Sequence, residues 1–272
     1  MLESALSNDL VRLMRQQQRR PNKNRERISN AISVLSNEYG PIPPEPRRLE
    51  PCHELVFTIL SQHTSDTNSE RAFTSLMKTF KTLENVANAP VKDIETAISR
   101  GGLAKIKAPR IKSVLTMILD LNQNSLDLSF LREMPLEDAK SWLKQLPGIG
   151  PKSAGIVLSF SLGMPAMAID THIFRVSQRL GFIKSNVNAD KAHDILEAIV
   201  DPDDVYPFHF ALITHGRQVC RAQNPLCEAC VLSTQCPSLK SIKSSKTIKR
   251  KTTPKAKPVV VPHTYPTEEV LN

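Results

Sequence analysis

A lysine that follows two closely spaced glycines is the first group in this sequence suited to chemistry. Residues 146–155 read LPGIGPKSAG, so that Gly148, Gly150 and Lys152 fall within five positions. Helical patterns flank the segment, and glycine permits both a tight turn and a close approach of the backbone to another molecule. The N–H groups at the start of the second helix form a site for an anion such as a phosphate. The segment predicts a helical hairpin with Ile149 filling the space between its helices.

Lys152 lies in the first turn of that second helix. The positive end of the helix dipole disfavours an ammonium group there. A neutral amine is a nucleophile toward carbon and forms a Schiff base. Taken alone, however, a lysine at this place is more often a phosphate contact or a solvated side chain.

An aspartate that follows 18 residues later, Asp170, is the second candidate. It is a typical helix N-cap, a role worth roughly 1 kcal/mol. Residues 152–162 as a helix rise about 15 Å. The return stretch 164–170 spans up to about 20 Å when extended. The chain can therefore bring Asp170 back beside Lys152, where a carboxylate would stabilise positive charge on a reacting sugar or activate an amine or a water.

Four cysteines lie within 17 residues, with six, two and five residues between them: Cys220, Cys227, Cys230 and Cys236. The absence of a recognisable secretion signal argues against disulfides. Four thiolates suit either a structural zinc ion or a [4Fe–4S] cluster, and the spacing alone leaves both open. Cys52 lies far away in sequence, and we expect it to be a buried thiol.

In this order and at these intervals, the motifs resemble the endonuclease III family of helix–hairpin–helix DNA glycosylases. The resemblance covers about residues 28–237 and excludes the two basic ends of the chain. The matching segments are Leu146-Pro147-Gly148-Ile149-Gly150-x-Lys152, Ile169–Val176, His215-Gly216-Arg217, the cysteine spacing, Leu60–Asp66, and Gly102-Leu103 with Lys107-Ala108.

The resemblance implies an all-α fold of two helical domains flanking a DNA-binding cleft, and a [4Fe–4S] cluster as the cofactor on the four cysteines. It also implies base flipping, in which the damaged nucleotide leaves the duplex and enters the cleft. Lys152 occupies the position of the nucleophile that attacks the sugar C1′ and expels the base; β-elimination from the Schiff base then nicks the strand. Asp170 takes the acidic role, and Gly148 and Gly150, with Ile149 between them, hold a backbone phosphate.

Three further positions are expected to contact DNA. Family members insert a glutamine into the duplex from the stretch that here reads Ser-Gln-His-Thr, so both Gln62 and His63 are candidates. Leu103 is the expected second wedge, although a leucine at helical spacing is more often part of a core. Arg221 is the one basic residue between the first two cysteines. The DNA contact of that loop is therefore expected to be weak.

Charge is concentrated at the ends of the 272-residue chain. The net charge is +9 in total, with +8 in residues 238–257 and +6 in 12–27, against −1 in 28–237. Such basic ends favour polyanions through counterion release. Composition excludes a membrane span, because the longest apolar stretch, 156–169, is too short and is interrupted by Ser, Gly and Pro.

Apolar spacing predicts a succession of helices. The helices are expected over 27–39, 54–60, from Asp66 or Thr67 through Phe80, 104–121, 136–146, 152–162, 170–180, 190–200 and 205–219, with a proline-rich crossover at 41–51. We expect a basic extension at 1–26, one domain from 27–49 and 165–237 with the iron–sulfur loop, a six-helix domain at 50–164, and a disordered basic tail at 238–272.

The predicted function is a bifunctional DNA glycosylase and AP lyase of base excision repair, with oxidised pyrimidines as the family's usual substrates. The partner is double-stranded DNA with a damaged base or abasic site. The chain is expected to be monomeric, without a membrane association, in the cytoplasm and with the nucleoid. Two alternatives are a monofunctional mismatch-type glycosylase and a non-catalytic iron–sulfur DNA-binding protein. The presence of Lys152 argues against the first, and Lys152 together with Asp170 against the second.

Overall fold

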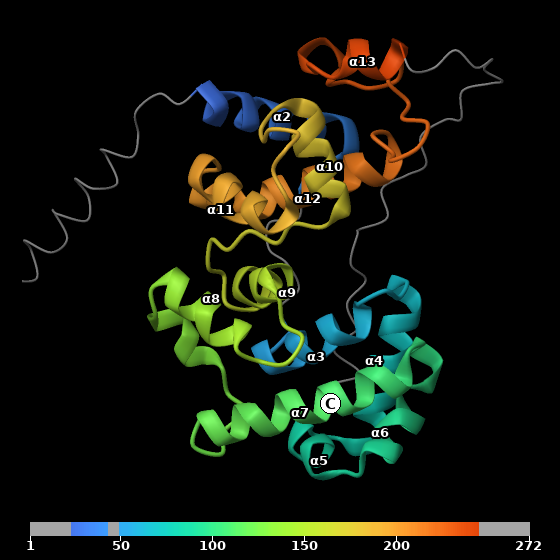
Figure 1. The fold of residues 1–272 in the computed structure, drawn as a ribbon, viewed down its shortest axis with the longest axis vertical. Helices are drawn as coiled ribbons and strands as arrows, with labels where there is room; N and C mark the ends of the chain where they lie inside the picture. The colour runs from blue at the N-terminus through green and yellow to red at the C-terminus, as the bar shows by residue number, and fades with distance from the viewer. Residues whose placement is uncertain (1–22, 43–48, 245–272) are drawn as a thin grey trace, which may run out of the picture.

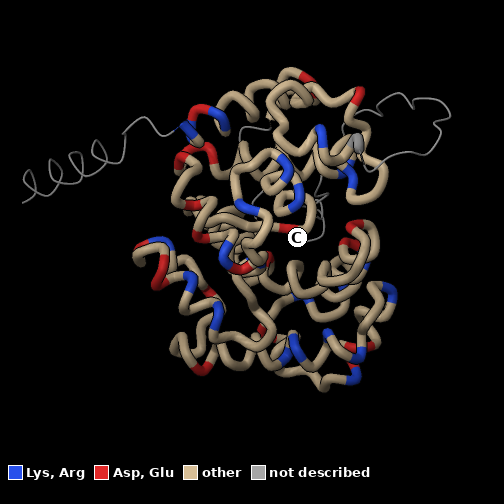
Figure 2. The backbone as a smooth tube through the Cα atoms, turned by 45° about the horizontal axis from the view of Figure 1, so that its top comes forward, with Lys and Arg blue, Asp and Glu red and all other residues tan. Residues whose placement is uncertain are grey.

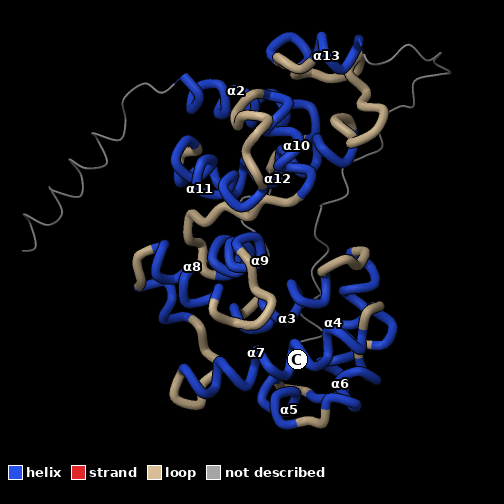
Figure 3. The backbone as a smooth tube through the Cα atoms, in the orientation of Figure 1, coloured by secondary structure: helices blue, strands red, loops and turns tan. Residues whose placement is uncertain are grey.

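The computed structural model describes residues 23–42 and 49–244. Within these ranges every regular element is a helix (Figure 3), which confirms the predicted all-α fold. The α-helices are α2 (Lys23–Tyr39), α3 (Pro51–Ser61), α4 (Asp66–Phe80), α5 (Leu83–Asn88), α6 (Val91–Ala97), α7 (Ala104–Leu121), α8 (Leu136–Lys144), α9 (Pro151–Ile156), α10 (Thr171–Leu180), α11 (Ala189–Ile199), α12 (Val205–Gln218) and α13 (Leu239–Ser244).

Short helical turns join several of these helices. The 3₁₀ turns are η1 (Ser99–Gly101), η2 (Ser129–Glu133), η4 (Pro202–Asp204) and η5 (Ser233–Gln235). A π-helical turn, η3 (Val157–Ser161), directly follows α9. The helix predicted over 152–162 is therefore wider in its second half, with the N–H of Leu162 bonded to the carbonyl of Val157. A π-turn inside a helix often marks a functional site.

One hydrophobic cluster extends from Leu49 to Ala168 and joins helices α3–α9 into what we call the middle lobe. It occupies the lower part of Figure 1. Phe73 on α4 is fully buried at its centre, edge-on to Phe57 of α3. Within residues 49–168, all of which the structure describes, there are seven α-helices, where the resemblance implied six.

A second hydrophobic cluster joins the two ends of the described chain into the terminal lobe. Its residues come from 28–35 on α2 and from 167–232, which includes α10–α12. Helix α12 packs on both α2 and α10. The phenol of Tyr39 at the end of α2 bonds Nδ1 of His215 on α12 at 2.7 Å. In Figure 1 this lobe lies above the middle lobe.

Two helices that the sequence analysis did not anticipate are α5 and α6. They have six and seven residues, too few to show a hydrophobic period. The sequence did contain one sign of α5, because threonine is a common N-cap residue. In the structure Thr82 caps this helix and accepts a hydrogen bond from the N–H of Asn85 at 3.2 Å.

The chain ends differ in part from the prediction. The tail predicted to be disordered from residue 238 instead begins with helix α13. The rest of that tail, the predicted extension before residue 23 and most of the proline-rich crossover lie outside the described residues.

Charged residues of both signs are spread over the two lobes (Figure 2), as the near-neutral net charge of 28–237 requires. No helix within the described ranges has the length and apolarity needed to span a bilayer.

Candidate active site and DNA-binding surface

The glycine hairpin between α8 and α9 forms as predicted. Gly148 has a φ of 75°, and a β-carbon there would lie 2.7 Å from Nε of Arg110. The backbone conformation therefore favours glycine at this position, and a larger residue would also displace the Arg110 side chain. Ile149 is 5% exposed and closes the turn, with its N–H bonded to the carbonyl of Leu146. Both the side chain and the N–H of Ile149 thus make contacts within the hairpin.

Gly150 differs from Gly148 in what surrounds it. It is the N-cap of α9 with an extended backbone, and a β-carbon there would meet no atom within 4 Å. The protein's own packing therefore does not require glycine at residue 150. As the N-cap, Gly150 adjoins the first N–H groups of α9, and an anion can bind such groups at a helix start.

Lys152 is the second residue of α9 and its side chain is exposed. One turn further along the helix, Gly155 touches the returning chain: a β-carbon there would lie 2.4 Å from the carbonyl oxygen of Met167. The chain therefore comes back against the first turns of α9. Met167 precedes Asp170 by three residues, and Gly155 follows Lys152 by three, so both candidate groups lie close to this contact.

Asp170 is the N-cap of α10, as its sequence context predicted. Its Oδ1 accepts the N–H groups of His172 and Ile173 at 2.8 and 2.7 Å. Both bonds use Oδ1, and Oδ2 accepts no hydrogen bond from the part of the chain that the structure describes. One carboxylate oxygen is thus fixed by the helix, while the other makes no such bond within the described residues.

The stretch before Asp170 is held by two histidines of the terminal lobe. The N–H of Ile169 donates to Nε2 of His193 at 3.2 Å, and Nδ1 of His209 donates to the carbonyl of Ala168 at 2.9 Å. Because His193 accepts through Nε2, its imidazole is neutral. Burial lowers the His193 pKa, which agrees with this neutral state.

The two loops predicted to wedge into DNA lie side by side. The hydroxyl of Thr64 donates to the carbonyl of Gly101 at 3.1 Å, which joins loop 62–65 to loop 101–103. Buried Lys107 on α7 reinforces this junction by donating to Leu60 and to Thr64, each at 2.5 Å. Burial lowers the pKa of Lys107.

Gln62 points toward the hairpin. Its Oε1 accepts from the Arg110 guanidinium at 2.7 Å, and its Nε2 lies 3.4 Å from the carbonyl of Gly148. The side chain thus links α7 to the glycine turn. His63, by contrast, is exposed at the tip of the loop with a φ of 54°.

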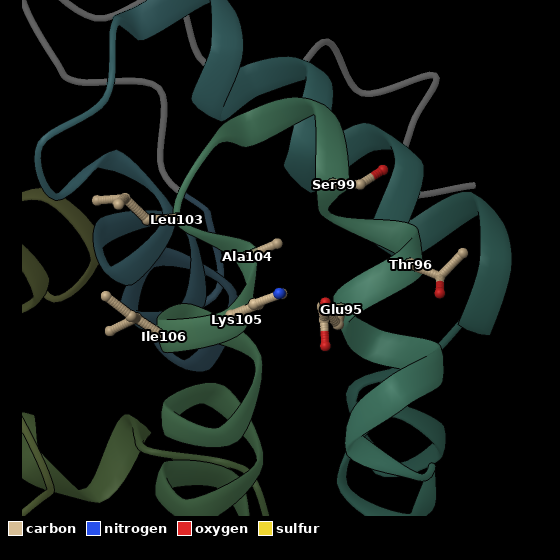
Figure 4. Close-up of a pocket in the computed structure, with 7 residues that line it drawn as sticks. All are labelled: Glu95, Thr96, Ser99, Leu103, Ala104, Lys105 and Ile106. Carbon is tan, nitrogen blue, oxygen red and sulfur yellow. The ribbon is translucent and has the colours of Figure 1, made fainter.

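Leu103 and Ile106 are exposed apolar side chains at the start of α7, at 48% and 56% of their surface. Leu103 is the N-cap of the helix in a left-handed conformation, with φ 56°. Figure 4 shows the two side chains projecting on the same side, away from α6, while Lys105 turns toward Glu95. The exposure of Leu103 argues against the core role that helical spacing would favour.

Arg110 and Lys107 are the positions whose contacts the sequence analysis missed. A signal was present, because residues 103, 107 and 110 are spaced i, i+4, i+7 and so share one face of α7. Leu103 at the start of that face was already a candidate.

The four clustered cysteines are free thiols that line one cavity at the end of the terminal lobe. No three His, Cys, Asp or Glu side chains in the described ranges are arranged to hold a single metal ion. The Cys52 thiol, as expected, is buried elsewhere, and burial raises its pKa to about 12.

Arginines of α10 hold the cysteine loop in place. Arg175 donates to the carbonyls of Cys220 and Gly216 at 3.0 and 2.9 Å. Arg179 donates to the carbonyl of Arg221 at 2.7 Å. Arg221 itself is exposed and bonds the carbonyl of Gln218 at 3.0 Å. The loop is thus fixed to the helix that Asp170 caps.

One ion pair joins the lobes near the wedge loops. Arg217 of α12 lies 3.1 Å from the carboxylate of Asp66 at the start of α4. Both side chains are more than a third exposed, so the pair contributes little stability but still links the lobes at this point.

Comparison with known proteins identifies this architecture. The HhH-GPD superfamily of base excision DNA repair proteins matches residues 56–202. Endonuclease III of Thermotoga maritima is 32% identical over 191 residues, which are 70% of this chain and 84% of that protein. A non-covalent endonuclease III–DNA complex superposes with a TM-score of 0.69 at 26% identity, over 81% of this chain and 98% of the other. A trapped endonuclease III–DNA covalent intermediate gives the same TM-score and identity over 80% and 98%. This chain therefore belongs to the HhH-GPD superfamily of base excision repair proteins and, within it, to the endonuclease III family.

Proposed function

We propose that this protein removes damaged bases from double-stranded DNA and then cleaves the strand at the abasic site, with oxidised pyrimidines as substrates. The observation that carries the proposal is the contact of Gly155 with Met167, which places the helix of Lys152 against the chain that leads into Asp170. Family membership and the likeness to a trapped covalent DNA intermediate support the same chemistry.

Lys152 is the proposed nucleophile. Its Nζ lone pair forms a bond to C1′ of the flipped nucleotide, and the glycosidic bond breaks with its electron pair leaving on the base, which takes up a proton. The sugar ring opens to a Schiff base. Loss of a C2′ proton then expels the 3′ phosphate, and water releases Lys152 from the product.

Asp170 supplies the negative charge. Its Oδ2 stabilises the positive charge that develops on the sugar and assists proton transfer at the amine. Oδ1 remains committed to the start of α10, so the carboxylate is preorganised for this task.

The proposed DNA-binding surface consists of the glycine hairpin and the two loops that carry His63 and Leu103. Gly148 and Gly150 allow a backbone phosphate to approach the start of α9, and Ile149 keeps the turn closed. Leu103 and His63 are the proposed wedges, because both are exposed on adjoining loops. Gln62 is instead proposed to hold the glycine turn, since its amide is committed to Arg110 and Gly148. Arg221 adds a further phosphate contact.

The four cysteines Cys220, Cys227, Cys230 and Cys236 are proposed to hold a [4Fe–4S] cluster. All four line one cavity. Four thiolates suit either a zinc ion or a [4Fe–4S] cluster, and membership of the endonuclease III family favours the cluster. The cluster would fix the loop that α10 holds. Visible absorption with iron and sulfide analysis tests the proposal, and zinc in their place would contradict it.

Borohydride trapping on a duplex with one abasic site tests the lyase. The wild-type protein should give a covalent adduct, Lys152→Ala should give none, and Lys144→Ala, which removes the same charge from neighbouring helix α8, should trap normally. A panel of duplexes with one lesion each then identifies the base. Base release without nicking by the wild type would instead establish the monofunctional alternative. Binding with no turnover would establish the non-catalytic one. A monomeric state and a location with chromosomal DNA remain predictions of this function.

A further inference from the structure

Glu197 on α11 reaches out of the terminal lobe with both carboxylate oxygens engaged. Its Oε1 accepts the N–H of Met167 at 2.6 Å. Its Oε2 pairs with Nζ of Lys140 on α8. Met167 is the residue whose carbonyl meets Gly155, so Glu197 holds the returning chain at the point where that chain touches α9.

Lys140 belongs to the other lobe, on the helix that leads into the glycine hairpin. The residue is 9% exposed, and the side chain of Glu197 is 12% exposed. Lys140 also pairs with Glu137 at 2.9 Å. Burial alone would lower the Lys140 pKa, but the hydrogen bonds to the two glutamates outweigh burial and raise it. Lys140 is therefore charged, and both side chains are largely withdrawn from water.

The pair lies beside residues that come shortly before both candidate catalytic groups in the chain. Lys140, Glu197, Pro151 and Met167 line one hollow of about 200 Å³. Pro151 directly precedes Lys152, and Met167 comes three residues before Asp170. The pair of Lys140 and Glu197 thus links the start of α9, which carries Lys152, to the chain that leads into Asp170.

We propose that Glu197 is a positioning residue for the reaction: through its bond to Met167, it sets where Asp170 lies relative to Lys152. This inference rests on the proposed roles of Lys152 and Asp170. A catalytic group misplaced by about 1 Å can cost roughly a hundredfold in rate. Glu197 therefore acts on the chemical step and leaves DNA binding unchanged.

Two double variants separate positioning from simple stability. Lys140→Met with Glu197→Gln removes both charges and keeps an oxygen that accepts from Met167. Lys140→Met with Glu197→Leu removes both charges and that acceptor as well. Removing only one partner of a buried ion pair is costly because the other charge is left unpaired. Neither double variant leaves such a charge. The two differ only in the hydrogen bond to the returning chain.

The experiment measures how fast each variant forms a borohydride-trappable adduct in a single turnover on a duplex with one abasic site. The Kd for the same duplex and the thermal unfolding of each variant are measured alongside. We expect the glutamine variant to react at nearly the wild-type rate and the leucine variant about 10–100-fold more slowly. Both should bind DNA with unchanged Kd. Equal rates in the two variants, or a rate loss that follows a rise in Kd, would overturn the inference.

Glu197→Asp in the otherwise unchanged chain provides a second test should the leucine variant not fold. It keeps a negative charge opposite Lys140 but withdraws the acceptor from Met167, and the same rate loss is expected. In an Asp170→Asn background, Glu197→Asp should add no further loss, because Glu197 acts through Asp170. If Asp170→Asn alone does not slow the reaction, the proposed function fails. If it does slow the reaction while the variants at residue 197 do not, only the positioning role fails.

Discussion

A β-carbon at Gly155 would lie 2.4 Å from the carbonyl oxygen of Met167 and 3.2 Å from Cα of Ala168. Helix α9 and the chain that returns to it are thus in backbone-to-backbone contact. No rotamer change can relieve an added methyl group there, because the neighbouring atoms belong to the main chain.

Gly155→Ala should therefore damage the site although alanine is the better helix former. The gain in helix propensity is about 1 kcal/mol, whereas overpacking costs about 1–3 kcal/mol. We expect a lower Tm together with a slower reaction, because residues 167–170 must move. Gly150→Ala is the matched control. Its β-carbon meets nothing within 4 Å, so the Tm should fall only by the loss of a glycine N-cap, less than in Gly155→Ala, while the Kd for DNA rises. Normal kinetics in Gly155→Ala would show that the contact is not needed.

Asp170 combines a helix cap with the proposed chemistry, and two substitutions separate the roles. Asp170→Asn keeps a good cap, whereas Asp170→Ala loses it at about 1 kcal/mol, or roughly 2–4 °C in Tm. Both should slow single-turnover base release by about 10²–10⁴-fold, since both remove the charge. A fully active asparagine variant would restrict Asp170 to a structural role.

Gln62 and His63 should respond differently to alanine. Gln62→Ala breaks the bonds to Arg110 and the Gly148 carbonyl, and so should weaken binding to intact and damaged duplexes alike. His63→Ala should leave binding to intact duplex unchanged and lower the rate of base flipping. A fluorescent base analogue opposite the lesion reports the rate of base flipping. The reverse pattern would make Gln62 the wedge.

Glu54 carries a pH dependence of stability. Burial in α3 raises its pKa from 4.5 to about 8, with Thr58 partly opposing the shift. The folded protein therefore holds a proton that the unfolded chain releases above pH 4.5. The Glu54 contribution to stability is complete below pH 4.5 and is lost as the pH rises to about 8.

Glu54→Gln should remove this pH dependence. Thermal unfolding at pH 4.5 should be close to that of the wild type, while at pH 8.5 the variant should have the higher Tm, by about 2–4 °C for each kcal/mol gained. Glu50→Gln, an exposed position on the same helix boundary, is the control and should leave the pH profile unaltered.

The expected limits of α4, α7, α8 and α10–α12 agree with the structure to within two residues, whereas α2 and α3 begin four and three residues earlier than expected. Helix α7 spans the predicted Ala104–Leu121, and α10 begins after the predicted cap at Asp170. Short elements such as α5, and the wide turn after Ile156, depend on tertiary packing that leaves no period in the sequence.

The candidate site was predictable where a residue type is tied to a backbone requirement. Gly148 with its positive φ and Ile149 in the turn are of this kind. Lys140 and Glu197 are not, because they are 57 residues apart and meet only through the fold. The same holds for Gln62, whose partner Arg110 lies on another helix.

The packing of α2 on α12 has a consequence for biosynthesis. The middle lobe is one continuous stretch of chain and can gain its core while the remainder is still being translated. Helix α2 is the first helix of the described residues to leave the ribosome, but its apolar face is covered only after residues beyond 200 have been made. A nascent chain halted before α12 therefore exposes Ile28, Ile32 and Leu35 to chaperones.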